Sequence, residues 1–189
     1  MAEIGAPRSR SNSLAIRTIS STSYASFVVA LATRERQPHW VDVVPSPVNG
    51  GRRRDGLKRY LADTHAVLWF AAGDVSRLGR RARRVFAALA ARRVDVALSV
   101  VSLWEVALLH DEGAIRLPAG FSAWCEAVEG ELGLRVEPLV LDDVEAARAL
   151  ADLRDPHDRL IAGTSVRLGA PLLTADARLS AAHGIETIW

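Results

Sequence analysis

Four acidic residues of this 189-residue chain stand directly against short apolar segments. They are Asp63, Glu105, Asp158 and Asp176. Carboxylates gathered in such surroundings repel one another and lose hydration, and a bound cation relieves both effects. A set of oxygen ligands without a Cys cluster or paired His suits Mg²⁺, with Mn²⁺ as the alternative. A hydrated Mg²⁺ can lower the pKa of a bound water, orient it and neutralise a leaving oxygen, which is the chemistry of phosphodiester hydrolysis.

Helix capping offers a structural explanation for the same acids. Asp63 and Asp176 could cap helices that begin immediately after them, and Asp158 could complement a helix dipole. Glu105 could complete a capping box with the Ser three residues before it, if its helix begins late. For Asp155, which precedes a Pro, capping is the better explanation. Capping leaves unexplained why the other four acids all stand against apolar segments.

The hydrophobic pattern from Lys58 onward alternates between strands and helices. Strands are expected over 58–63, 94–98, 136–141, 171–174 and 185–189, and helices over 64–72, 78–92, 99–111, 121–132, 142–153, 156–168 and 177–183. This alternation predicts an α/β fold with helices on both faces of a mainly parallel sheet. Ligands of such sheets bind beyond the carboxyl ends of the strands, where at least three of the four acids would meet.

Residues 1–56 differ in composition from the rest of the chain. They contain Ser/Thr clusters and eight Arg against four acidic residues, whereas residues 57–189 hold 16 basic and 18 acidic residues. The extension could be a transit peptide, a disordered arm that contacts RNA, or the product of a start codon assigned too early. We favour the last and expect residues 1–56 to lack fixed structure, with the domain occupying 57–189.

Other bulk features exclude several classes of protein. Cys125 is the only cysteine, which excludes an intrachain disulfide and a Cys-cluster metal site; its place in an apolar helical stripe predicts a buried thiol. No apolar run approaches the ~20 residues of a membrane span, so we expect no membrane association and a cytoplasmic location. The slightly acidic domain means that the basic pI says little about nucleic acid.

Four sequence motifs together resemble those of PIN-domain ribonucleases of the VapC toxin kind. The matching segments occur in order and at sensible spacing, and they are 61–69 (LADTHAVLW), 99–107 (SVVSLWEVA), 155–162 (DPHDRLIA) and 172–176 (LLTAD). His157 stands where the family usually has Phe, and the extension has no counterpart in the family pattern. Any one motif is weak evidence, whereas the ordered set across residues 57–189 is strong.

The resemblance implies a PIN-like three-layer α/β/α fold with a sheet of about four to five strands. It assigns catalysis and metal binding to Asp63, Glu105, Asp158 and Asp176, with Mg²⁺ or Mn²⁺ as the cofactor and a metal-activated water as the nucleophile. Thr174 and Asp155 are further candidates for the site, and Arg159 could orient a phosphate, although a local ion pair is the favoured role for it. The implied function is that of the toxin of a type II toxin–antitoxin system.

The partners implied are an RNA substrate, a cognate antitoxin and a second copy of the chain in a homodimer. The Arg run over 77–93 either binds RNA phosphates or is a solvated helix face, and the sequence leaves these alternatives open. A catalytically silent PIN-like module acting through a protein partner is the rival of another class. Haloacid-dehalogenase-like phosphatases need a second Asp two residues after Asp63, where His65 stands, and receiver domains need a late Lys that the chain lacks. A flap-endonuclease-like enzyme normally has a longer chain and more acids.

Overall fold

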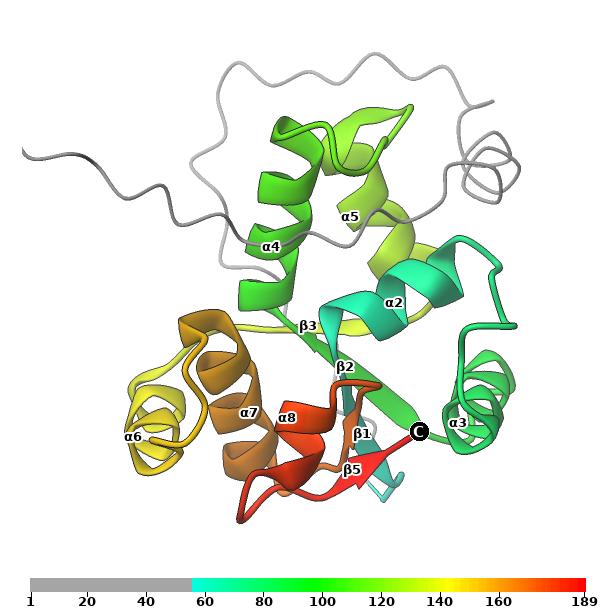
Figure 1. Cartoon of the computed structure of the whole chain (residues 1–189). Helices are drawn as coiled ribbons and strands as arrows, with labels where there is room; N and C mark the ends of the chain where they lie inside the picture. The colour runs from blue at the N-terminus through cyan, green and yellow to red at the C-terminus, as the bar shows by residue number, and fades with distance from the viewer. Residues whose placement is uncertain (1–55) are drawn as a thin grey trace, which may run out of the picture.

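The computed structural model describes residues 56–189, so the extension expected over residues 1–56 lies, except for Gly56, outside the described residues. Five strands and seven helices make up the described part. In chain order they are β1 (Arg59–Ala62), α2 (Thr64–Ala71), α3 (Arg80–Ala90), β2 (Asp95–Ser99), α4 (Val100–Asp111), α5 (Gly120–Gly130), β3 (Arg135–Glu137), α6 (Leu141–Ala149), α7 (Pro156–Leu168), β4 (Leu172–Leu173), α8 (Ala177–Ala181) and β5 (Thr187–Ile188) (Figure 1).

The five strands form one parallel sheet in the order β3-β2-β1-β4-β5. The first strand in the chain is therefore the central one, and Leu61 is paired with Ala97 of β2 on one side and Leu172 of β4 on the other. This arrangement confirms the predicted α/β fold and its parallel sheet. It also brings the carboxyl ends of β1, β2 and β4 to the same edge.

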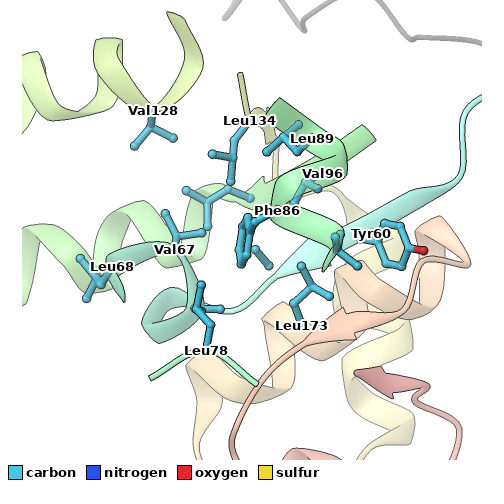
Figure 2. Close-up of a cluster of buried hydrophobic side chains, with 14 of the residues drawn as sticks. Tyr60, Val67, Leu68, Leu78, Phe86, Leu89, Val96, Val128, Leu134 and Leu173 are labelled. Atoms are coloured by element: carbon cyan, nitrogen blue, oxygen red, sulfur yellow. The ribbon is translucent and has the colours of Figure 1, made fainter. Parts of the chain in front are cut away.

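Both faces of the sheet are buried, and side chains alternate between them along each strand. Tyr60 and Ala62 of β1 point into a core shared with α2, α3 and α5, whereas Leu61 points into a second core shared with α7 and α8. In Figure 2 Phe86 of α3 lies in the midst of the first core; its ring stacks on Phe70 with centroids 4.2 Å apart. The helices on the two faces give the three layers predicted from the alternating pattern.

Several boundaries differ from the prediction. At β3 the apolar run continues past Pro138, which has no amide to donate to the strand ladder. The strand expected over 136–141 is confined to Arg135–Glu137, and that expected over 171–174 to Leu172–Leu173. The helix expected to reach residue 153 ends at Ala149. No helix in residues 56–189 is both long enough and apolar enough to cross a bilayer.

A chain of ion pairs ties the β3 edge of the sheet to α6 and α7. Asp143 of α6 is fully buried, and its carboxylate accepts hydrogen bonds from Arg167 Nε of α7 at 2.5 Å and from the Val140 amide at 2.9 Å. Arg167 also reaches Glu137 of β3, which in turn pairs with Arg135. Because these charges are satisfied inside the fold, α7 is held in a defined position relative to the sheet.

The crossing of α6 and α7 is close enough to require a glycine. A Cβ added at Gly163 of α7 would clash with the carbonyl oxygen of Asp143 and approach the Ala147 amide nitrogen and Cβ at 3.0 and 3.1 Å. The two helices lie side by side along one flank of the sheet (Figure 1). Since α7 carries the candidate residue Asp158 in its first turn, this contact helps to position the site.

We predict that Gly163→Ala lowers the free energy of unfolding by about 2 kcal/mol, because the backbones of α6 and α7 must move apart. The matched control is Gly130→Ala in α5, where an added Cβ meets nothing within 4 Å and should be neutral or slightly stabilising. Chemical denaturation of both variants measures the difference. Equal stabilities for the two variants would show that the α6–α7 contact tolerates a methyl group.

Candidate functional site

The four acids come from four separate segments that meet at the carboxyl edge of the sheet. Asp63 follows β1 directly, and Asp176 follows β4 by three residues. Glu105 lies in α4, the helix that begins where β2 ends, and Asp158 lies in the first turn of α7. Since β1 is flanked by β2 and β4, the sheet itself brings these segments together.

Asp63 is the buried centre of the group, with 5% of its surface exposed. Its Oδ1 accepts a hydrogen bond from the Thr64 amide at 2.7 Å, and its Oδ2 accepts one from Thr174 Oγ1 at 2.9 Å. The Thr174 hydroxyl accepts in turn from the Asp176 amide at 3.0 Å. Thr174, a candidate from the sequence, therefore connects Asp63 to the segment that carries Asp176.

Glu105 is held by a threonine from the neighbouring segment. The Thr64 hydroxyl donates to Glu105 Oε2 at 2.5 Å. The helix α4 begins at Val100 with Ser99 as its side-chain cap, so Ser102 is inside the helix and the capping-box explanation for Glu105 is wrong. Glu105 projects from the body of the helix and is not needed to cap its start.

Asp158 and Asp176 share one guanidinium. Arg178 Nη2 lies 2.5 Å from Asp176 Oδ2 and 3.2 Å from Asp158 Oδ2. Asp158 accepts no cap hydrogen bond in α7, because Asp155 caps that helix by accepting from the His157 and Asp158 amides. The structure thus confirms capping for Asp155 and leaves Asp158 free for another role.

Two of the four acids both cap a helix and belong to the acidic group at the sheet edge. Asp63 occupies the N-cap position of α2, and Asp176 that of α8, where it accepts from the Arg178 amide at 2.7 Å. In both cases one carboxylate oxygen contacts the helix start, while the other accepts a hydrogen bond from Thr174 in Asp63 and from Arg178 in Asp176. Asp158 accepts no cap hydrogen bond, but it lies in the first turn of α7, where it complements the helix dipole as the structural explanation predicted. Glu105 lies in the body of α4, and neither capping nor the dipole accounts for it.

Burial and mutual repulsion disfavour the charges of three of the acids. Burial raises the pKa of Asp63, and it raises the pKa of Glu105 to about 7 and that of Asp158 to about 6. Repulsion adds to each shift, since Glu105 faces Asp63, Asp158 and Asp155, and Asp158 faces Asp155, Asp63 and Asp176. In contrast, hydrogen bonds from Arg178 lower the pKa of Asp176.

The residues present fit a hard divalent cation. The donor atoms are carboxylate oxygens with a hydroxyl beside them, and the electrostatic repulsion among them is what a cation relieves. Within residues 56–189, however, no three acidic, His or Cys side chains already converge on one ion position. Asp63 and Glu105 accept hydrogen bonds from Thr hydroxyls, and Asp158 and Asp176 share the Arg178 guanidinium. The site therefore contains oxygen atoms of the kind that a divalent cation prefers, and these oxygens now contact Thr and Arg side chains.

Other candidates from the sequence lie at the margin of the group or away from it. Arg159 makes no ion pair with a described residue; its guanidinium donates to the Ala147 carbonyl oxygen at 3.2 and 3.3 Å, so the expected local ion pair is not formed. His157 Nδ1 lies 3.8 Å from Glu105 Oε1, at the periphery. His65 is exposed on α2.

Two residues of the site were missed by sequence reasoning, namely Thr64 and Arg178. The signal for Thr64 was its place directly after Asp63 in the first motif, which suggested only a helix start. The signal for Arg178 was its position two residues after Asp176, which puts both side chains at the start of one short helix. A pairing with Asp158 from a distant segment could not be read from that spacing.

The α3 arginines and Cys125 were the other features noted in the sequence. The arginines of α3 are exposed opposite a buried stripe of Ala82, Val85, Phe86 and Leu89, which fits either alternative for that face. Cys125 is only partly buried; it packs against the first core, and burial raises the pKa of its thiol to about 11. A group with that pKa is a poor nucleophile at neutral pH.

Comparison with known proteins identifies the fold. No protein-family model matches the chain, and no curated protein matches its sequence. Among solved structures, a chain of VapBC2 from Rickettsia felis bound to a DNA fragment from its promoter is similar with a TM-score of 0.53 and 12% identity, covering 69% of this chain and 97% of that one. DNA-bound VapBC from Salmonella typhimurium is similar with a TM-score of 0.49 and 19% identity, covering 70% of this chain and 97% of that one. FitAcB from Neisseria gonorrhoeae is similar with a TM-score of 0.46 and 17% identity, covering 68% of this chain and 96% of that one. The first similarity shows a shared fold over nearly all of that chain, and the α/β/α architecture is accordingly PIN-like.

We predict that Glu105→Gln stabilises the metal-free protein at pH 8 and changes little at pH 5. The folded pKa of about 7 lies above the ordinary value of 4.5, so the charge that forms as the pH rises through 7 costs folding free energy. The gain at pH 8 should be about 2 kcal/mol, reduced by partial exposure of the side chain.

Thermal unfolding in EDTA at the two pH values measures this effect, and Glu112→Gln at the exposed end of the same helix is the control that should change neither. A Gln variant that is less stable at both pH values would show that the Thr64 hydrogen bond, and not the charge, dominates at this position.

Proposed function

We propose that residues 57–189 form a Mg²⁺- or Mn²⁺-dependent endoribonuclease that hydrolyses RNA phosphodiester bonds and acts as the toxin of a toxin–antitoxin pair. The observation that carries the proposal is the meeting of four carboxylates from four segments at one sheet edge, where burial and repulsion disfavour the charges of three of them. Helix starts give Asp63, Asp158 and Asp176 a structural explanation, but they give none to Glu105 in the body of α4. A divalent cation gives all four a common role.

Asp63, Glu105, Asp158 and Asp176 would hold the cation, with Thr174 beside them. The cation would supply Lewis-acid charge and lower the pKa of a water, which suits attack on a phosphodiester. The chain's own part is to present the ligands in fixed orientations. The Thr174 hydroxyl orients Asp63, and the Thr64 hydroxyl orients Glu105, so both carboxylates are positioned by hydrogen bonds from adjacent segments. No His base is needed for this chemistry, in agreement with the marginal positions of His65 and His157.

RNA as the substrate, and an antitoxin and a second copy as partners, are supported by the motif resemblance. The fold shared with a chain from a VapBC2 complex supports the toxin–antitoxin assignment at the level of architecture. Adjoining exposed apolar side chains also favour protein partners, since Val100 and Trp104 stand one turn apart and are 38% and 55% exposed. Both lie on α4, the helix that also carries Glu105.

The alternative function is a catalytically silent PIN-like binding module that acts only through a protein partner. One observation favours it: Arg178 already neutralises part of the acidic edge without the help of a metal. The two functions differ in what a metal titration does. A silent module gains neither nuclease activity nor a saturable metal response, whereas the proposed enzyme gains both.

We predict endoribonuclease activity that appears with Mg²⁺ or Mn²⁺ and is abolished by EDTA. Asp63→Asn should keep the fold and lower activity by about a hundredfold or more, since even residues that only support a metal ligand contribute about 10–100-fold. The matched control is Asp142→Asn, an exposed acid in the first turn of α6, which should retain full activity. Gel-based cleavage of labelled RNA provides the measurement. Activity that persists in EDTA, or that depends on His65 and not on Asp63, would contradict the proposed metal-dependent chemistry.

The partner proposal predicts that a cognate antitoxin inhibits the nuclease through a basic segment laid against the acidic edge. The reason is charge complementarity, because uncompensated carboxylates attract Arg or Lys. Neutralising the basic residues in the C-terminal segment of the antitoxin should weaken inhibition at least about tenfold, as expected when charge pairs across an interface are lost. Inhibition that survives this neutralisation would argue for a contact elsewhere on the domain.

A further inference from the structure

Arg178 is the one Arg or Lys of the described residues that pairs with any of the four acids. It is the second residue of α8, and its side chain is 69% exposed. Its Nε lies 3.1 Å from Asp176 Oδ1 and 3.2 Å from Oδ2, while Nη2 reaches 2.5 Å from Asp176 Oδ2 and 3.2 Å from Asp158 Oδ2. One guanidinium therefore engages three carboxylate oxygens from two separate segments.

These three oxygens are among those that a cation at the acidic edge would need. A guanidinium and a divalent cation cannot both take the same lone pairs of Asp158 and Asp176 at contact distance. Each also relieves the same repulsion among the acids, so binding of one lowers the affinity of the acids for the other. Competition is expected on both grounds, the shared atoms and the shared charge.

We propose that Arg178 is an internal counter-ion of the acidic edge, which stabilises the metal-free protein and is displaced when a divalent cation binds. This inference rests on the metal site of the proposed function and adds to it a residue that tunes metal affinity. Arg178 is a positioning residue in this role, because it acts through Asp158 and Asp176.

The surroundings of Arg178 allow the displacement. The side chain lines a cavity of about 360 Å³ that is also bounded by Asp155, Asp158 and Leu153. The guanidinium can therefore leave the carboxylates and remain at the surface in water. Because the Arg178 side chain is largely exposed, breaking its ion pairs costs little. Arg159 has no such freedom, since it is bound to the Ala147 carbonyl oxygen.

The matched control residue is Arg154. It lines the same cavity and carries the same charge, yet it forms no ion pair with a residue in the described part of the chain. Replacing Arg154 tests the general effect of removing a positive charge near the acids. Replacing Arg178 tests that effect together with the release of the three oxygens.

The experiment is calorimetric titration of the full chain with Mn²⁺ alone, with thermal unfolding in EDTA as the second readout. We expect Arg178→Gln to bind Mn²⁺ about five- to tenfold more tightly than the unchanged chain, on the scale of one or two exposed ion pairs. The same variant should melt at a lower temperature in EDTA, because the repulsion is then uncompensated. Arg178→Lys, which keeps the charge but not the bidentate geometry, should fall between the two, and Arg154→Gln should change the affinity less than about twofold, as a charge without a close partner does.

The opposite signs of the two effects separate competition from a merely structural role. If Arg178 only supports the fold, Arg178→Gln lowers stability and leaves Mn²⁺ affinity unchanged or weaker, and that result overturns the proposal while the metal site stands. Equal tightening by Arg178→Gln and Arg154→Gln overturns it as well, since general charge would then be sufficient. If neither the unchanged chain nor any variant binds Mn²⁺, the metal site of the proposed function fails and the competition fails with it.

Discussion

The parallel pairing of β1 with both β2 and β4 is the constraint on which the rest of the site depends. A strand at the centre of a parallel sheet has neighbours whose carboxyl ends lie at the same edge, so the segment leaving β1 is flanked by the segments leaving β2 and β4. Asp63 comes directly after β1 with almost no freedom of position, because its backbone amide bonds to the Leu173 carbonyl oxygen at 3.1 Å. The acids from the other segments then approach a fixed, buried carboxylate.

Helix starts account for how the fold tolerates this concentration of negative charge. Asp63, Asp158 and Asp176 each lie at or within the first turn of a helix, where unpaired amides and the helix dipole favour a carboxylate. Glu105 lies in the body of α4, without that support, and burial is the main cause that raises its pKa to about 7. Capping and metal binding are therefore not competing explanations of the same residues. The helix starts stabilise three of the carboxylates, and Glu105 is the acid of the group that lies outside a helix start.

Much of this could be predicted from the sequence, and the remainder has a common physical cause. The order of strands and helices, the acids at strand ends and the Asp155–Pro156 helix start can all be inferred from local pattern, because each depends on residues within a few positions. The strand expected at β3 was too long, since apolar residues continue past Pro138, which has no amide to donate to a ladder. At β4 the assigned strand is short, although Pro171 and Thr174 beside it still make backbone hydrogen bonds with Leu61 and Ile188. The Thr64–Glu105 and Arg178–Asp158 contacts were missed because they join residues far apart in the chain, 41 positions in the first case, which only the packed sheet and helices bring together. Arg159 was misassigned for the same reason, since its partner is a backbone carbonyl on another helix and leaves no trace in side-chain types.

The position of Asp158 depends on contacts between residues that lie far from the acidic edge. Asp63 is set by the sheet directly, but Asp158 is set by α7, and α7 is set by α6 through the close approach at Gly163 and the buried Asp143–Arg167 pair. Arg167 extends this connection to Glu137 on the outermost strand, so the β3 edge and the first turn of α7 are parts of one rigid arrangement. Asp158, a proposed metal ligand together with Asp63, thus derives its position from residues that lie away from the acidic edge. Its counter-ion Arg178, in contrast, is anchored only to a five-residue helix and is largely in water. Asp63 and Asp158 are thus held by the packed sheet and helices, whereas the guanidinium paired with Asp158 lies at the surface, as the proposed exchange with a divalent cation requires.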